Sequence, residues 1–181
     1  MRLICLCAGC LLAFGCGGTP PEPGRPGELA PVENPFGPED SYYAPQPHRD
    51  RPYAIARAGD RLFVALRGTE DAPGRELAVL DARTFETLGR IEVGLAPTAL
   101  AAHPSGRHLV VLNRFASYAS IVDARAMRAV GEIPVPFYCE GIDFSPDGSR
   151  ALVTNRWKDS VLRFRVRLVG DALRVVPVDV L

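Results

Sequence analysis

Three arginines stand at equivalent places in the chain, each at the end of a short apolar run. The set consists of Arg67, Arg114 and Arg156, together with their neighbours Asn113, Asn155 and Trp157. A guanidinium group forms paired hydrogen bonds with carboxylate and phosphate groups, so arginines gathered at one rim of a fold would suit an anionic partner. The alternative is that solvated arginines simply follow the ends of strands. The sequence leaves both interpretations open.

A cysteine and a glutamate lie side by side between two of these apolar runs, at Cys139 and Glu140. A thiol can act as a nucleophile, but no histidine aligns with it to accept the proton. A lone cysteine is more often a buried small apolar side chain, and we expect that role here. His48, His103 and His108 show no ligand-like spacing with one another or with the cysteine, so we expect no metal site.

The sequence motifs that accompany catalysis are missing. The chain has no GxSxG, no CxxCH for covalent haem, no HExxH and no glycine-rich phosphate loop. The one CxxC sequence, between Cys7 and Cys10, lies inside an apolar N-terminal run that export would remove. We therefore favour a protein that is not an enzyme, and we expect no cofactor.

Balanced charge limits the range of partners. The 181 residues contain 21 Lys and Arg against 21 Asp and Glu, so the molecule as a whole has no strong field that would attract nucleic acid or an anionic membrane surface. Hydrophobic residues make up 47% of the chain, which is enough to build a core. We expect a folded protein that does not bind nucleic acid.

The first residues have the composition of an export signal. Arg2 precedes an apolar run over residues 3–14, and small residues follow. The sequence LAFGC over residues 12–16 resembles the signal of bacterial lipoproteins, although Ala13 stands where leucine is usual. The resemblance implies a signal peptide over residues 1–15 and acylation of Cys16. It also implies a lipid anchor in the cell envelope, on the periplasmic or extracellular face and at the outer membrane.

Residues 16–51 are rich in proline and glycine and contain almost nothing that can be buried. Such a composition predicts a disordered linker between the anchor and the folded part. After removal of the signal, the acylated cysteine would leave Cys139 as the single free thiol, so no intramolecular disulfide can form.

The rest of the chain contains a sequence repeat. The sequence PSGRHLVVLNR over residues 104–114 returns as PDGSRALVTNR over residues 146–156, a spacing of 42 residues. A unit of ~40–45 residues with four short apolar runs is typical of a propeller blade. We predict an all-β partial β-propeller over residues 52–181, with about three four-stranded antiparallel blades at about 52–95, 96–136 and 137–181.

Each unit contains a second hairpin, and in the first two units its first strand ends at an aspartate, at Asp81 and at Asp123. These carboxylates could bind a metal or act in catalysis. Because each ends a strand before a tight turn, we expect instead that it accepts backbone hydrogen bonds in an Asx-turn. The third unit has Arg165 at this place.

The runs LVVLN at residues 109–113 and SIVD at 120–123, with FSPDG at 144–148 and LVTN at 152–155, resemble the YVTN repeat of bacterial surface and periplasmic β-propellers. The resemblance covers roughly residues 52–178. It implies the fold rather than a function, because the family is similar to lactonase-like and haem-binding propellers, dehydrogenase subunits and plain binding scaffolds alike.

We expect an exported, lipid-anchored β-propeller module that binds a protein or a small anionic ligand without catalysis. The alternative is the propeller part of a periplasmic enzyme or of a cytochrome-associated electron-transfer protein whose catalytic or haem-bearing region lies outside this chain.

Three blades do not close a propeller of ~4–8 blades. We therefore expect a fragment of a longer protein, with further blades or self-association needed for closure. We also expect the two end sheets to expose apolar faces. The residues expected there are Leu62, Val64 and Leu66 at one end and Phe164, Val166 and Leu168 at the other.

Overall fold

The computed structural model describes residues 50–181, which form twelve β-strands. The signal peptide, Cys16, His48 and almost the whole linker predicted above lie outside the described residues. Within the described part, no helix is long and apolar enough to cross a membrane.

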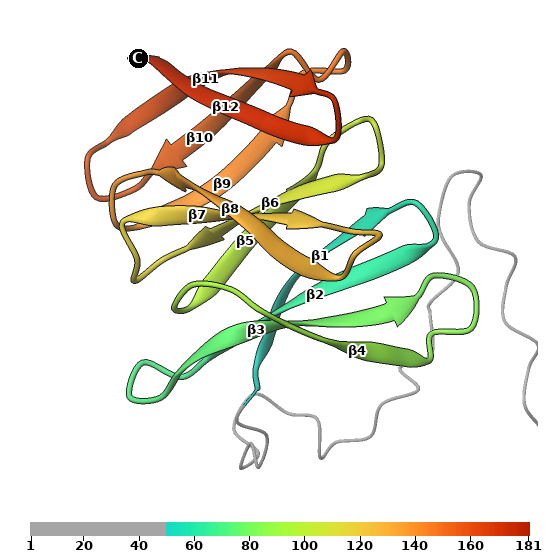
Figure 1. Ribbon diagram of the computed structural model, residues 1–181. Coiled ribbons are helices and arrows are strands. Elements are labelled where there is room, and N and C mark those ends of the chain that lie inside the picture. Colours follow the sequence, from blue (N-terminus) through green and yellow to red (C-terminus); the bar gives the residue numbers. More distant parts are fainter. Residues whose placement is uncertain (1–49) are drawn as a thin grey trace, which may run out of the picture. The chain divides into compact units, whose positions relative to one another are not determined.

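The strands form three four-stranded antiparallel sheets, each built from four consecutive strands (Figure 1). The first sheet contains β1 (Pro52–Ala58), β2 (Arg61–Gly68), β3 (Pro73–Asp81) and β4 (Thr87–Glu92). The second contains β5 (Pro97–Ala102), β6 (His108–Asn113), β7 (Tyr118–Asp123) and β8 (Arg128–Pro134). The third contains β9 (Cys139–Phe144), β10 (Arg150–Asn155), β11 (Ser160–Val169) and β12 (Ala172–Val180). The all-β, three-bladed arrangement predicted from the repeat is confirmed.

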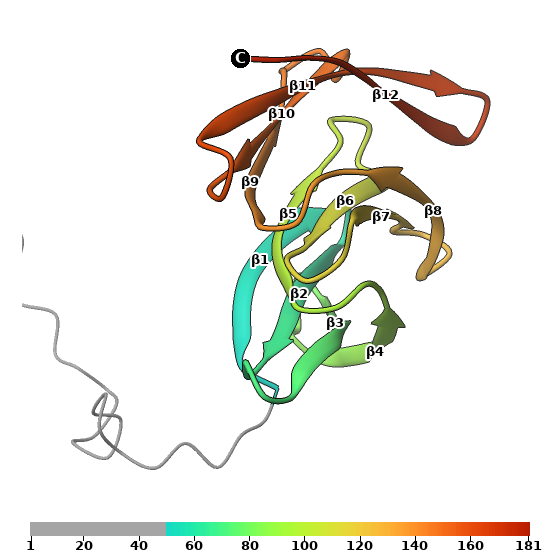
Figure 2. The ribbon, with the colours of Figure 1, turned by 90° about the vertical axis from the view of Figure 1, so that its left-hand side faces the viewer.

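The first strands of the sheets, β1, β5 and β9, lie next to one another, and the later strands fan outward (Figure 2). Each first strand turns into the second through a glycine with positive φ, at Gly59 (61°), Gly106 (70°) and Gly148 (71°). Glycine adopts this conformation without the steric cost that a Cβ imposes. The repeated glycine therefore gives the three sheets the same first hairpin.

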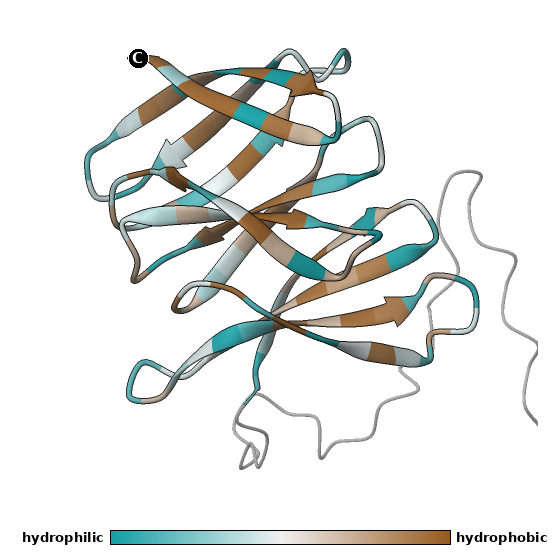
Figure 3. Ribbon diagram, viewed as in Figure 1, coloured by the Kyte–Doolittle hydropathy of each residue, from teal (hydrophilic) through white to brown (hydrophobic). Residues whose placement is uncertain are grey.

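Two apolar cores hold the sheets together, and alternate residues of β6 contribute to each. Leu109 and Val111 pack against the first sheet, whereas Val110 and Leu112 pack against the third. A strand buried on both faces reads as a continuous apolar run, which explains the sequence of β6. Figure 3 shows that most hydrophobic residues lie in the strands.

The predicted exposure of Phe164 and Val166 is wrong. They are 1% and 2% exposed and belong to the core between the second and third sheets. Phe164 lies opposite Ala151, which faces the second sheet, so the intervening arginines of β11 face outward instead. Only Leu168, at the far end of this row, is 45% exposed.

In the first sheet, the exposure of the apolar residues agrees better with the prediction. Leu62 and Val64 are half-buried on its outward face, while Phe63 and Ala65 between them are fully buried against the second sheet. Leu66, expected to be exposed, is buried at 7% exposure.

Candidate functional site

One backbone arrangement recurs in all three sheets and positions the predicted arginines. The N–H of each arginine donates to the carbonyl oxygen of a residue just before the first strand of its sheet. The pairs are Arg67 to Arg51 at 3.2 Å, Arg114 to Ala96 at 2.9 Å and Arg156 to Tyr138 at 3.3 Å. Each acceptor residue has a positive φ, between 39° and 61°, which is uncommon outside glycine. The three arginines therefore lie at the same end of the three sheets, which we call the rim.

Two glutamates alternate with these arginines along the rim. Glu70 forms an ion pair with Arg67 and lies 3.7 Å from Nη1 of Arg114. Glu140 lies 3.6 Å from Nε of Arg114 and 3.9 Å from Nη1 of Arg156. The structure thus brings the arginines into one row of alternating charge across all three sheets. With three cations and two anions, the row has one positive charge in excess.

Aromatic rings line the same row. The Arg67 guanidinium lies 5.0 Å from the centre of the Tyr53 ring. The Arg114 guanidinium lies 5.4 Å from the Phe115 ring and 5.3 Å from the Tyr138 ring. Contacts of this kind attract the cation to the ring face and fix its position. The central guanidinium is therefore held by two carboxylates and two rings.

Trp157 is the most exposed large hydrophobic side chain of the described residues, at 73%. It stacks on Tyr138 with ring centres 5.3 Å apart and ring planes inclined by 23°. Arg156, just before it, has a side chain that is 77% exposed. The tryptophan thus offers an open aromatic surface beside the charged row.

Unsatisfied polar atoms gather at this end of the second sheet. Four buried side-chain polar atoms among the described residues have no hydrogen-bond partner, and three of them are Thr98 Oγ1, Asn113 Oδ1 and Arg114 Nε. These residues are close in the fold, because Pro97, which precedes Thr98, pairs with Asn113 across β5 and β6. Buried polar groups normally have partners, so this cluster leaves hydrogen-bonding capacity unused beneath the rim.

The two predicted asparagines are buried at 2% exposure and form turns. Nδ2 of Asn113 donates to the carbonyl oxygen of Tyr118 at 3.1 Å and to Oγ of Ser120 at 3.0 Å. Nδ2 of Asn155 donates to the carbonyl oxygen of Phe137 at 2.8 Å. Both asparagines thus stabilise the loops at the rim. That either of them contacts a ligand stays a prediction.

Cys139 is 1% exposed, as expected for a buried small side chain. Its thiol donates to the carbonyl oxygen of Pro136 at 3.2 Å, and burial raises its pKa despite a hydrogen bond from Asn155. A raised pKa disfavours the thiolate, which is the nucleophilic form.

The histidines of the described residues also have structural positions. His103 accepts from the N–H of Ser105 at 3.1 Å in the turn between β5 and β6. His108 is 1% exposed, and burial lowers its pKa. No group of three potential metal ligands occurs within residues 50–181.

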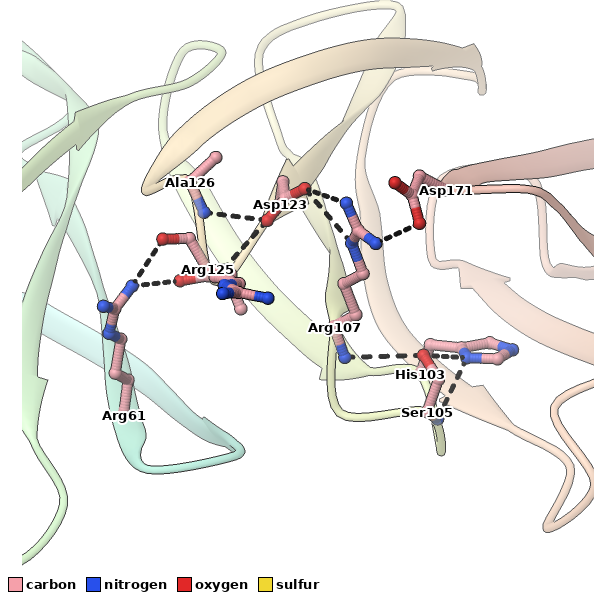
Figure 4. A network of polar contacts seen from close by, with 9 residues as sticks. Arg61, His103, Ser105, Arg107, Asp123, Arg125, Ala126 and Asp171 are labelled. Atoms are coloured by element: carbon pink, nitrogen blue, oxygen red, sulfur yellow. Dashed lines mark hydrogen bonds and ion pairs between the residues drawn. The ribbon is translucent and has the colours of Figure 1, made fainter.

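Figure 4 shows the polar network at the opposite end of the sheets. Oδ1 of Asp123 accepts from the N–H groups of Arg125 and Ala126 at 2.9 and 2.8 Å, and its Oδ2 lies 3.4 Å from Arg107. Burial raises the pKa of Asp123, but these contacts outweigh it and the net shift is downward. Arg107 also forms an ion pair with Asp171 and so links the second sheet to the third.

The Asx-turns predicted at the two aspartates are therefore confirmed. Oδ1 of Asp81 accepts from the N–H groups of Arg83 and Thr84 at 2.8 Å each, just as Asp123 does in the next sheet. These carboxylates hold turns and ion pairs, and they lie at the far end from the rim.

Sequence reasoning missed part of the rim. The second unit has Ser117 at the place of Glu70, and Thr98 lies in a run of small residues, so no pattern common to all three units marked either. The sequence places Glu140 next to Cys139 and gives no sign that its carboxylate contacts two arginines.

Repeated four-stranded antiparallel sheets with their first strands side by side define a β-propeller. The sequence matches the family model of YNCE-like beta-propellers over residues 56–169, and the chain belongs to this family. A comparison with curated proteins gives no match.

Solved structures show the same fold. Hydrazine synthase of Kuenenia stuttgartiensis is similar with a TM-score of 0.58 and 27% identity, over 70% of this chain and 35% of that chain. The periplasmic gluconolactonase of Pseudomonas aeruginosa gives 0.57 and 18%, over 71% and 41%. A functionally unknown protein from Desulfotomaculum acetoxidans gives 0.59 and 16%, over 74% and 43%. This chain thus spans well under half the length of these structures.

Proposed function

We propose that this chain is part of an exported, lipid-anchored β-propeller that acts as a non-catalytic binding module of the cell envelope. We propose further that its rim binds the carboxylate or phosphate of a small ligand or of a protein. One observation supports the binding site above all others: the Arg114 guanidinium is held between two glutamates and two aromatic rings, but neither carboxylate is within hydrogen-bonding distance of it. Its two carboxylate contacts, at 3.6 and 3.7 Å, are longer than ordinary hydrogen bonds.

Glu70 and Glu140 restrict the chemical class of ligand that the rim would bind. They hold Arg114 in place, but they also repel a bare anion, which leaves only one net positive charge along the row. A ligand that combines an acidic group with hydroxyl groups would suit the site better, because hydroxyls donate to carboxylates while the acid accepts from arginine. Trp157 would cover an apolar face of such a ligand.

Calorimetric titration of the purified chain with gluconate, citrate and inorganic phosphate tests this site. We expect Arg114→Ala to weaken binding by about 1–3 kcal/mol, the range for a lost charge-assisted hydrogen bond. Arg83→Ala is the matched control, because Arg83 is exposed at the opposite end and its removal changes the net charge equally. Equal binding by wild type and by a triple variant of Arg67, Arg114 and Arg156 would make these arginines ordinary surface residues.

Lipid anchoring is tested separately. The LAFGC sequence supports acylation of Cys16, so mass spectrometry of the exported protein should find an acylated cysteine at the N-terminus. Detection of an unmodified N-terminus further along, or full membrane retention of a Cys16→Ser variant, would contradict the anchor.

A second candidate function is the propeller part of a periplasmic enzyme or an electron-transfer protein. The similarity to hydrazine synthase, at 27% identity over 70% of this chain, supports it. A haem-binding CxxCH in the complete gene product would favour this candidate. Hydrolysis of gluconolactone by the chain itself would instead contradict the non-catalytic proposal.

A further inference from the structure

The outward face of the third sheet is formed largely by arginine. Strand β11 alternates, so that Phe164 and Val166 point into the core while the arginines between them point away from it. The outward arginines are Arg163, Arg165 and Arg167 on β11, Arg150 on β10 and Arg174 on β12, and we call them the arginine face.

Two pairs of these arginines lie directly opposite each other on neighbouring strands. Arg150 is the cross-strand partner of Arg165, and Arg167 is the partner of Arg174. All four side chains are exposed, and none has an ion-pair partner within residues 50–181. Like charges placed opposite each other destabilise a sheet, so the pairs do not serve its stability. Only Arg163 is neutralised, by Asp179 on β12.

This face differs from the faces by which the sheets pack on one another. On the second sheet, Leu112 and Ile121 face the third sheet within its apolar core. One repeat later, the place of Val110 is kept by the exposed Leu152, but Thr154 and Arg163 occupy the places of Leu112 and Ile121. A further sheet packed here in the same way would bury the ion pair of Arg163 and Asp179, whose desolvation is costly. The face is therefore suited to a charged partner.

Exposed valines accompany the arginines on β12, which is the edge strand of the sheet. Val176 is 58% exposed and Val178 is 46% exposed, whereas Val180 pairs with Leu162 on the core side of the sheet. Val176 lies directly opposite Arg165 and so shares its face. No aromatic residue accompanies these arginines on the outward side of β10, β11 and β12.

The residue composition of the arginine face favours one kind of acidic partner over others. The anchors of protein interfaces, whether aromatic or arginine, fill well-packed, desolvated pockets, and single-stranded nucleic acid is bound by stacking of bases on aromatic rings. A lipid surface needs neither, because its mobile phosphate groups can adjust to the arginines and its interface accepts aliphatic side chains. We propose that the arginine face binds the surface of an anionic lipid bilayer. The overall charge of the chain is zero, but the fold gathers five arginines on one sheet face.

This site is separate from the rim and does not require the lipid anchor. If Cys16 is acylated, the anchor would keep the domain close to the membrane and raise its effective concentration there. A weak contact by the arginine face would then set which side of the domain meets the lipid.

Vesicle sedimentation of the full chain carrying Cys16→Ser tests the proposal without acylation. Binding should be stronger to vesicles containing about one third phosphatidylglycerol than to pure phosphatidylcholine, and it should fall as salt is raised from about 0.1 to 0.5 M. Substitution of Arg165, Arg167 and Arg174 by Gln should weaken binding to the anionic vesicles by about a hundredfold, since each basic residue near such a surface contributes about fivefold.

The matched control replaces three exposed arginines on the other sheets, Arg57, Arg83 and Arg128, by Gln. It has the same net charge and the same apolar N-terminal run as the face variant. Any difference in vesicle binding between the two variants is therefore due to the arginine face. Arg167→Gln near the exposed end of the β11–β12 hairpin is a milder variant, with an expected loss of about fivefold. Equal binding by face and control variants would overturn the proposal. So would binding that does not depend on phosphatidylglycerol, or capture of the face by polyglutamate without any binding to vesicles.

Discussion

Replacement of Phe164 by Ala tests the orientation of β11, on which the arginine face depends. The ring is 1% exposed and lies in the core formed with Val110, Ala151 and Val153. Truncation of a buried phenylalanine removes its apolar contacts and leaves a cavity, so we expect the free energy of unfolding to fall by about 3–5 kcal/mol. With a urea slope of about 2 kcal/mol/M, the midpoint should fall by about 1.5–2.5 M.

The matched control is Leu168→Ala, because Leu168 belongs to the same row of β11 but is 45% exposed. Its loss should cost less than about 1.5 kcal/mol. Urea unfolding followed by far-ultraviolet circular dichroism measures both variants, and the slope should stay unchanged. A Phe164→Ala variant that costs no more than Leu168→Ala would refute the burial of this row and restore the opposite orientation of the strand.

Three further predictions follow from the turns and the buried thiol. The Ser145 hydroxyl and the Ser149 N–H and hydroxyl lower the pKa of Asp147 from 3.8 to about 2. Its contribution to stability should therefore be present above about pH 4 and be lost as the pH falls toward 2, and Asp147→Asn should remove that part of the pH dependence in acid unfolding. Gly106→Ala should cost about 1 kcal/mol in urea unfolding because φ is 70° there, although a Cβ would meet no atom closer than 3.6 Å. Cys139 should react with a thiol reagent only after unfolding, as followed by the mass of its peptide, and rapid labelling of the folded chain would contradict its burial.

The fold could be predicted because the repeat encodes it several times. The spacing of 42 residues, the turn glycine and the Asx aspartate recur in the sequence, and each corresponds to the same hairpin in the structure. Repetition also predicted that Arg114 and Arg156 would lie at one end of the sheets. Such agreement between local signals is what allows a sequence to specify one fold.

The direction of β11 could not be predicted in this way. Its residues alternate between apolar and arginine, so a period of two shows that the faces differ but not which one meets the second sheet. Only the pairing of Phe164 with Ala151 decides it. The cross-strand pairing of Arg167 with Arg174 could not be predicted either, because it depends on the register of the hairpin formed by β11 and β12.

The rim was predicted in outline and not in detail. The arginines follow strand ends that the repeat defines, but their neutralisation by Glu70 and Glu140 depends on contacts between sheets, which no sequence pattern records. The site is therefore less basic than the sequence indicates.

The most direct test of the proposed binding site uses Trp157, the single tryptophan of the chain. Its ring stacks on Tyr138, which in turn contacts Arg114, so its fluorescence reports events at the rim. Titration with gluconate, citrate or inorganic phosphate should give a saturable change in emission for at least one of them in the wild-type chain. The same titration of Arg114→Ala should require at least about tenfold more ligand, which corresponds to about 1.4 kcal/mol. An emission that stays constant with all three anions, or identical curves for the two proteins, would contradict the proposal.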